Sequence, residues 1–309
     1  MSKAILIHPE ELDEIWIDQA SAQRLNTLAL HPWGGGKAHE TLEELLQRLE
    51  DPAFRRLLDR IRDHGMRVEY EFHAASWLLP RALFDTHPEY FRMDAEGNRT
   101  PKNNLCVSNP NALTVMAENA VRLMKRLYGT GHRYYFWMDD CTKNGGCHCP
   151  ACRKLSVSDQ QMLALNAMLT AMKAEDPRAE LAYLAYRESL EPPTVEPLSG
   201  IFLEYAPIQR DFTKTVEEAP NEELAVLPAL LEKFGTETAA LLEYWYDNSL
   251  FSKWKKPPQP FTPNNENIRR DLEFYRSLGF RDIRTFACFL GWDYRELYGM
   301  PDLSAYGNE

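Results

Sequence analysis

Four of the six cysteines lie in one short segment, in the pattern Cys141-x5-Cys147-x-Cys149-x2-Cys152. Two thiolates at C-x2-C spacing bind one Zn²⁺, and two more complete the tetrahedral ligand set of a structural zinc site. In a reducing compartment, such clusters bind metal more often than they form disulfides. The sequence therefore predicts a structural Zn²⁺ site formed by these four cysteines.

Other arrangements of the cysteines stay open at this stage. The segment is also compatible with free thiols or with one disulfide, and His148 is able to replace Cys141 as a ligand. Cys106 and Cys288 lie in apolar, strand-like runs and are interpreted as small core residues.

A second group of candidate residues is acidic: Asp139, Asp140, Glu204 and Glu243. Glycoside hydrolysis needs one protonated carboxylic acid at the leaving oxygen and a second carboxylate as nucleophile or base. We expect Asp140 to be the general acid, with Asp139 as second choice. Glu243 is expected to be the nucleophile or base, with Glu204 as the alternate. The competing interpretation of each acid is a structural ion pair with Arg or Lys.

Aromatic and polar residues at predicted strand ends suit sugar recognition, because rings stack on a pyranose face while polar groups bind its hydroxyls. The residues expected to bind substrate are His31, Trp33, His73, Trp77, Arg187, Tyr205, Trp245, Asp247 and Trp292. The competing interpretations are ordinary packing for the tryptophans, loop capping for Asp247 and pairing with Glu188 for Arg187.

Strand-like and helix-like segments alternate along the whole chain. The predicted strands are 26–31, 67–73, 104–108, 132–140, 181–187, 201–206, 241–247 and 283–290, and a helix over 10–24 precedes the first of them. Asn109-Pro110 and Ser158 predict helix starts. Eight such alternations predict an α/β fold, a single-domain (β/α)8 TIM barrel over 1–309, with 141–152 as a cysteine-rich loop after the fourth strand.

An open, doubly wound sheet is the alternative architecture. It usually carries a glycine-rich fingerprint after an early strand, and neither that pattern nor a Walker A loop occurs in this sequence. No organic cofactor is therefore expected. In the barrel, the reactive groups belong at the carboxyl ends of the strands.

The charge balance narrows the range of partners. With 35 Lys and Arg against 46 Asp and Glu, the net charge of −11 disfavours nucleic acid and anionic membrane surfaces. No apolar run approaches the ~20 residues of a membrane span, and the start of the chain lacks the features of a signal peptide. We therefore expect a cytoplasmic protein that binds neither nucleic acid nor membrane.

Three stretches resemble a bacterial barrel family catalogued only as a domain of unknown function, number 4838. They are LNTLALHPWGGG, then HPEYFRMDAEGNRTPKNNLCVSNPNA, then FWMDDC…CHCPACRKLSVSDQQMLALN followed by ELAYLAYRE and IFLEYAPIQR. The resemblance covers about Asn26 to Arg210. It implies a barrel similar to α-glucuronidases and β-hexosaminidases, in which Asp139-Asp140 occupies the place of an Asp-Glu pair after the fourth strand.

Together, these features predict a glycoside hydrolase that cleaves a small glycoside or oligosaccharide by a two-carboxylate mechanism. The first alternative is a non-catalytic carbohydrate-binding barrel, and a second is a scaffold organised by a zinc knuckle. The expected partner is a carbohydrate substrate. A homo-oligomer, in which a partner subunit supplies a wall of the cleft, stays open.

Overall fold

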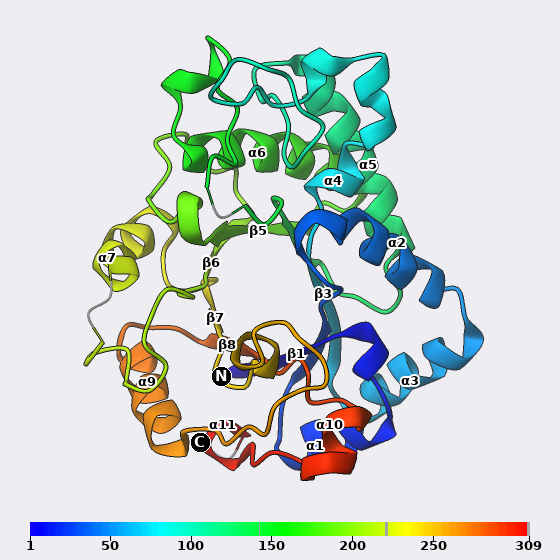
Figure 1. The fold of residues 1–309 in the computed structure, drawn as a ribbon, viewed down its shortest axis with the longest axis vertical. Coiled ribbons are helices and arrows are strands. Elements are labelled where there is room, and N and C mark those ends of the chain that lie inside the picture. The colour runs from blue at the N-terminus through cyan, green and yellow to red at the C-terminus, as the bar shows by residue number, and fades with distance from the viewer. Residues whose placement is uncertain (142, 220–221, 308–309) are drawn as a thin grey trace. The chain divides into compact units, whose positions relative to one another are not determined.

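The computed structural model describes residues 1–141, 143–219 and 222–307, and the chain forms a closed barrel of eight parallel strands. The strands, in barrel order, are β1 (Ser2–Ile7), β2 (Thr27–Leu30), β3 (Arg67–His73), β4 (Arg133–Trp137), β5 (Glu180–Ala185), β6 (Ile201–Tyr205), β7 (Ala240–Glu243) and β8 (Asp282–Phe286). Figure 1 shows helices around the ring of strands. The predicted (β/α)8 barrel is confirmed.

The helices that follow the strands differ widely in length. The α-helices are α1 (Glu14–Ala22), α2 (Ala38–Arg48), α3 (Pro52–Asp63), α4 (Ala75–Leu78), α5 (Pro110–Arg126), α6 (Val157–Glu175), α7 (Glu222–Phe234), α8 (Asn248–Phe251), α9 (Asn265–Ser277), α10 (Trp292–Tyr298) and α11 (Ser304–Gly307). Asn109 caps α5, with Pro110 at its first position, as predicted. Ser156 caps α6, two residues before the predicted Ser158.

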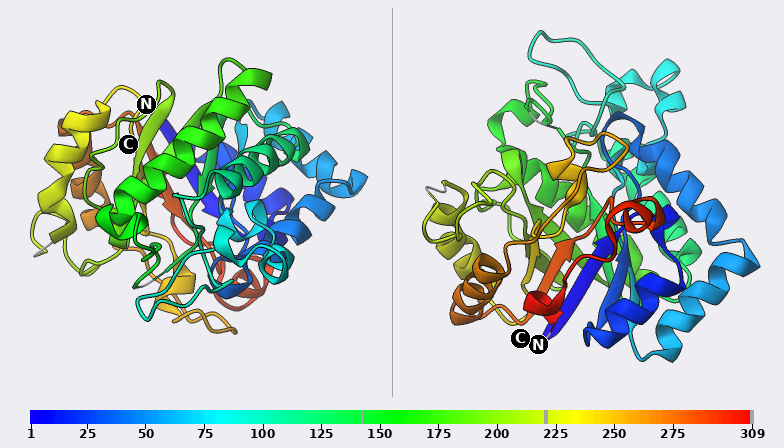
Figure 2. Two further views of the ribbon diagram at one scale, coloured as in Figure 1. Left: turned by 90° about the horizontal axis from the view of Figure 1, so that it is seen from above. Right: turned by 60° about the horizontal axis from the view of Figure 1, so that its bottom comes forward.

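The strand prediction needs two corrections, one for a missed strand and one for an extra strand. The segment 2–7, which was not predicted as a strand, is β1 and pairs with β8, as the right-hand view of Figure 2 shows. The predicted strand 104–108 contributes only an isolated bridge, between Leu105 and Phe91. The helix expected to precede the first strand is α1, which connects β1 to β2. One missed strand and one extra strand leave the total at eight, so the cysteine-rich segment still follows β4.

The chain divides into two compact units. Unit 1 comprises residues 1–31, 52–69 and 204–309, and unit 2 comprises residues 32–51 and 70–203. In unit 1, Arg284 of β8 is fully buried and contacts Glu69 at 3.0 Å and Asp282 at 2.7 Å. Glu69 therefore lies in a structural ion pair. None of the helices in the described part of the chain has both the length and the apolar character needed to cross a bilayer.

Candidate functional site

The turn that follows β4 holds Asp139 and Asp140 in unit 2. The Asp139 carboxylate accepts the Ser76 backbone N–H at 3.0 Å, and its own N–H donates to Asn104 Oδ1 at 2.9 Å. Asp140 is less constrained, because its side chain is 28% exposed and its contact in the structure is Arg187 at 3.3 Å. The two neighbouring acids therefore have different surroundings, one fixed by amides and the other open to solvent.

The end of β5 supports this turn from a second direction. Arg187 adopts a left-handed backbone with φ of 49°, a costly conformation for a residue with a Cβ, and its guanidinium lies over the Tyr186 ring at 4.9 Å. Glu188 accepts the backbone N–H groups of Asn144 at 2.6 Å and Gly145 at 2.7 Å. Arg187 therefore pairs with Asp140 and not with Glu188, which instead holds the cysteine-rich loop.

A small pocket of ≈ 50 Å³ lies beside this turn, lined among others by His73, Asp139, Tyr186 and Glu188. His73 Nδ1 is 2.6 Å from the Met138 carbonyl, so the ring donates its proton from Nδ1. The pocket gathers groups from the ends of three strands, β3, β4 and β5, at the place where barrel enzymes carry their reactive residues.

The two tryptophans predicted to bind substrate in unit 2 are half-buried. Trp77 donates its Nε1–H to Glu43 at 2.9 Å, and Glu43 also pairs with Arg126. The Trp33 carbonyl accepts the Thr41 hydroxyl. These contacts tie both tryptophans to α2, and neither residue lines the pocket beside Asp139.

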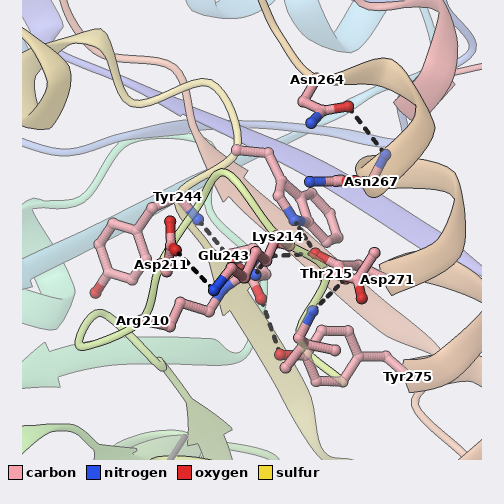
Figure 3. A network of polar contacts seen from close by, with 12 residues as sticks. Arg210, Asp211, Lys214, Thr215, Glu243, Tyr244, Asn264, Asn267, Asp271 and Tyr275 are labelled. Carbon is pink, nitrogen blue, oxygen red and sulfur yellow. Dashed lines mark hydrogen bonds and ion pairs between the residues drawn. The ribbon is translucent and has the colours of Figure 1, made fainter. Parts of the chain in front are cut away.

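Glu243, at the end of β7 in unit 1, lies in a buried ionic cluster (Figure 3). Its Oε1 accepts the Tyr275 hydroxyl at 2.8 Å, and its Oε2 is 3.0 Å from Arg210 Nη2. The same Arg210 nitrogen contacts Asp271 at 2.9 Å, and Trp245 donates to Asp271 at 3.0 Å. Glu243 and Trp245 thus point toward α9, on the helix side of the strand.

Burial dominates the electrostatics of this cluster. The side chains of Arg210, Glu243 and Asp271 are at most 1% exposed. Burial raises the pKa of Glu243, and the nearby charge of Asp271 raises it further, while Arg210 opposes both effects. One guanidinium thus holds two carboxylates in a dry site.

Tyr205 faces the same cluster from β6. Burial raises its pKa, and the charges of Glu223 and Glu243 add to the effect. Because side chains alternate along a strand, the preceding residue, Glu204, points to the opposite face, toward the barrel interior. Glu204 is fully buried.

Unit 1 also has a cluster of aromatic and histidine rings at the ends of β1, β2, β7 and β8, of which only His31 is predicted from the sequence. The His31 and Phe286 rings meet edge to face at 4.9 Å, and Tyr244 stacks on Phe286 at 5.2 Å. His8 Nδ1 is 2.7 Å from the His31 carbonyl, and burial lowers the pKa of His8. His8 could have been found from the sequence, because it directly follows the apolar run 4–7 and therefore lies at a possible strand end.

Two further predicted binding residues lie in the loops of unit 1. Asp247 caps α8 by accepting the N–H groups of Ser249 and Leu250, which is the loop-capping alternative of the sequence analysis. Trp292 begins α10 and is 61% exposed. The neighbouring Asp293 pairs with Lys256 at 2.7 Å.

The cysteine cluster differs from the predicted set in one member. The sulfur atoms of Cys106, Cys147, Cys149 and Cys152 all lie within 4.8 Å of one another and are buried. Cys141 lies apart from this group, where its sulfur accepts from the Asn103 side chain. Cys106 is buried, as expected of a core residue, but its sulfur lies beside those of the other three cysteines. The four cysteines of the group are close enough to hold a metal ion.

Hydrogen-bonding groups lie close to two of these sulfurs. Cys147 Sγ accepts the Met93 N–H at 3.3 Å, and Cys149 Sγ lies 3.3 Å from the Ser108 hydroxyl. All six cysteines of the chain are free of disulfides. Such outer contacts orient ligands at metal sites.

Comparison with known proteins places the chain in a family. A family model described as "Domain of unknown function (DUF4838)" matches residues 45–295. The chain belongs to this family. No curated protein matches the chain.

Solved structures of glycoside hydrolases share the barrel. A β-galactosidase from Rahnella sp. R3 aligns over 93% of this chain and 50% of its own, at 14% identity and a TM-score of 0.54. A GH20 module of the pneumococcal exo-β-D-N-acetylglucosaminidase StrH aligns over 99% and 83%, at 11% identity and a TM-score of 0.54. A Marinomonas ef1 β-galactosidase covers 93% and 54%, at 11% identity and a TM-score of 0.53.

The DUF4838 chain spans about half the length of the two β-galactosidases. At these identities, the likeness establishes the fold alone. The recognised family and the likeness to glycosidase barrels agree with the resemblance that the sequence carries.

The buried cap of α8 makes stability depend on pH. Burial raises the pKa of Asp247 to about 6, although hydrogen bonds from Ser249 and Leu250 lower it. The pKa of Asp in the unfolded chain is near 3.9, so the folded state binds the proton more tightly. Stability then falls as pH rises from about 4 to 6, and the loss is complete above pH 6.

Asp247→Asn keeps a capping side chain without the charge. We expect it to gain about 2–3 kcal/mol relative to the wild type between pH 4 and pH 7.5, measured by urea unfolding.

Asp302 provides a matched control, because it is an exposed residue that accepts the Ser304 N–H at the start of α11, and its pKa is lowered by hydrogen bonds from Ser304. Asp302→Asn should show the opposite trend, losing stability relative to the wild type as pH rises. If the free energies of unfolding of Asp247→Asn and the wild type differ by the same amount at pH 4 and pH 7.5, Asp247 does not have the raised pKa assigned to it.

Proposed function

We propose that this DUF4838 protein is a glycoside hydrolase that acts on a small glycoside or oligosaccharide through two carboxylates. The observation that carries the proposal is the turn after β4, where Asp139 lines a pocket with His73 and Tyr186 and the next residue, Asp140, is partly exposed. The likeness of the barrel to solved glycosidases supports the reaction class.

Asp140 is our candidate for the general acid. Its exposure gives a leaving-group oxygen access to the carboxyl, whereas the Asp139 carboxylate already accepts a backbone N–H. We assign Asp139 to positioning, with the acid role as its alternate. A substrate hydroxyl that displaces Arg187 from Asp140 would leave the guanidinium to bind the sugar.

For the second carboxylate we favour Glu204 over Glu243, although the sequence analysis ranked them in the reverse order. Both oxygens of Glu243 are engaged, by Tyr275 and Arg210, and the side chain faces α9. Glu204 lies on the opposite face of its strand from Tyr205 and is therefore not part of the Arg210 cluster. Glu243 then serves to hold β7 against α9.

The predicted sugar-binding residues can likewise be separated into those buried at the Arg210 cluster and those outside it. Tyr205 and Trp245 are buried at the Arg210 cluster, so we assign them to packing. Asp247 is assigned to capping α8, and the remaining candidates for substrate contact are His31, Trp33, His73, Trp77, Arg187 and Trp292. The carbohydrate is the proposed partner, and the cytoplasm is the proposed location.

The Asp140–Arg187 ion pair also favours a second candidate, a carbohydrate-binding barrel without catalysis. A carboxylate beside a guanidinium presents hydrogen-bond acceptors and donors side by side, which suits recognition of sugar hydroxyls. Turnover separates the two candidates.

The catalytic assignment is tested with chromogenic glycosides of neutral, amino and uronic sugars. On a substrate that the wild type turns over, Asp140→Asn and Glu204→Gln should each lower kcat by about 10²-fold or more, because each removes a proton-transfer or nucleophilic group. Glu243→Gln should retain kcat per folded molecule and lose stability, since it weakens a buried ion pair.

Asp211→Asn is the control, because Asp211 is an exposed acid beside Arg210. It should leave turnover unchanged. Unaltered kcat in both Asp140→Asn and Glu204→Gln contradicts the assignment. Sugar binding without turnover across the panel supports the second candidate instead.

We further propose that Cys106, Cys147, Cys149 and Cys152 bind one Zn²⁺ in a structural role. Four thiolates fill the tetrahedral positions of the ion and leave none for water or substrate. Cys106 belongs to the segment between β3 and α5, and the other three belong to the segment between β4 and α6. The metal would therefore fasten two loops of unit 2 to each other.

Two matched cysteine variants test this site. Cys106→Ser should lose Zn²⁺ from the reduced, purified protein, whereas Cys141→Ser should retain one equivalent, as measured by elemental analysis. Replacement by Co²⁺ should give thiolate charge-transfer bands in the wild type and in Cys141→Ser. Retention of metal by Cys106→Ser, or its loss from Cys141→Ser, would refute this ligand set.

A further inference from the structure

A second cavity, of ≈ 360 Å³, lies in unit 1, and none of the residues assigned to catalysis lines it. It is formed by the segments after β6 and β7 and by the start of α9. This volume falls in the range of about 300–1,000 Å³ that small-molecule sites occupy. The lining residues are Arg210, Phe212, Thr213, Trp245, Phe251, Pro260, Phe261, Thr262, Asn264, Asn267, Ile268 and Asp271.

Aromatic rings supply the apolar part of this cavity. Phe251 and Phe261 stack at 5.1 Å with an interplanar angle of 19°, and Phe212 meets Phe251 edge to face at 6.0 Å. Phe251 remains 40% exposed. The Trp245 indole is held in place by its bond to Asp271. Several fixed ring faces thus surround a space large enough for one or two small rings.

Neutral polar groups at the start of α9 supply the hydrogen-bonding part. Asn264 Oδ1 caps α9 at the Asn267 N–H, and Asn267 Nδ2 donates to the Thr213 carbonyl. Among the described residues, these contacts leave the Asn264 NH₂ group and Asn267 Oδ1 without a protein partner. One donor group and one acceptor therefore remain for a ligand.

The charged residues that line the cavity take part in ion pairs within the protein. Arg210, the only cation among its lining residues, is shared by Glu243 and Asp271. The other Asp271 oxygen accepts the Val216 N–H at 2.7 Å. With two carboxylates to one guanidinium, the cavity has no positive charge to offer an anionic ligand, and binding a carboxylate there would be repulsive.

Flat ring faces, one free donor and acceptor, and no spare cation together fit a neutral sugar. We propose that this cavity is a binding subsite for an uncharged hexose, and that it discriminates against uronic acids. The choice of ligand class rests on the proposed glycosidase function, because only a carbohydrate-active barrel has use for a second sugar site.

Binding of methyl glycosides tests the subsite without requiring turnover. The probes are the methyl glycosides of glucose, galactose and mannose, with methyl glucuronide as the charged comparison, measured by titration calorimetry and saturation-transfer NMR. At least one neutral probe should bind both the wild type and Asp140→Asn. Phe251→Ala, which removes an exposed ring, and Asn264→Ser, which keeps a good cap but removes the amide, should each weaken its Kd about tenfold or more.

Tyr298→Ala is the matched control, because Tyr298 is an aromatic residue of similar exposure, 45%, on α10, and it does not line the cavity. It should leave Kd unchanged. The subsite is refuted if no neutral probe binds, if binding survives both cavity variants, or if the glucuronide binds more tightly. Intact binding in a protein without turnover would refute the hydrolase proposal and leave the subsite standing.

Discussion

The Asn104 side chain is the contact on which the proposed site depends. Its Oδ1 accepts the Asp139 N–H, and its Nδ2 donates to the Gly145 carbonyl at 3.0 Å. Asn104 is buried, so losing either partner would cost about 1–3 kcal/mol. It lies two residues before Cys106 and therefore joins the cysteine cluster, the cysteine-rich loop and the acidic turn. Loops at barrel rims are ordinarily mobile, and the proposed metal, acting through this amide, would restrict the turn that carries both aspartates.

The sequence was sufficient to predict the architecture, because alternating periodicities reveal a barrel even when single strands are misassigned. The segment 2–7 is short and is soon followed by Pro9, so its sequence looks like an unstructured N-terminal segment. Only its pairing with β8 in the structure identifies it as a strand. The segment 104–108 has the composition of a strand but lies in the loop that carries Asn104 and Cys106. Local pattern cannot distinguish a strand from an ordered loop fixed by buried side chains, because tertiary contacts decide between them.

The candidate site was predictable only in part, for a related reason. Asp139 and Asp140 follow β4 directly, and position after a strand is visible in sequence. The direction in which the Glu243 side chain points could not be predicted from the sequence. Both faces of β7 are buried, and a strand of four residues shows little hydrophobic periodicity. The partners that fix it, Arg210 and Tyr275, lie 33 and 32 residues away. Cys106 was missed likewise, since its distance along the chain from Cys147 conceals how closely their sulfurs approach.

Hydrogen exchange at the turn after β4 is the most direct test of the link from metal cluster to acidic turn. Mass spectrometry would compare exchange in the segment 134–141 for the reduced, Zn²⁺-loaded protein before and after chelation. We predict that protection of this segment falls as the metal leaves, because Asn104 then loses its fixed position beside Asp139. The β8 segment 282–286 should remain protected. Unchanged exchange in 134–141 after complete removal of the metal, or a protein that takes up no Zn²⁺, would contradict the account.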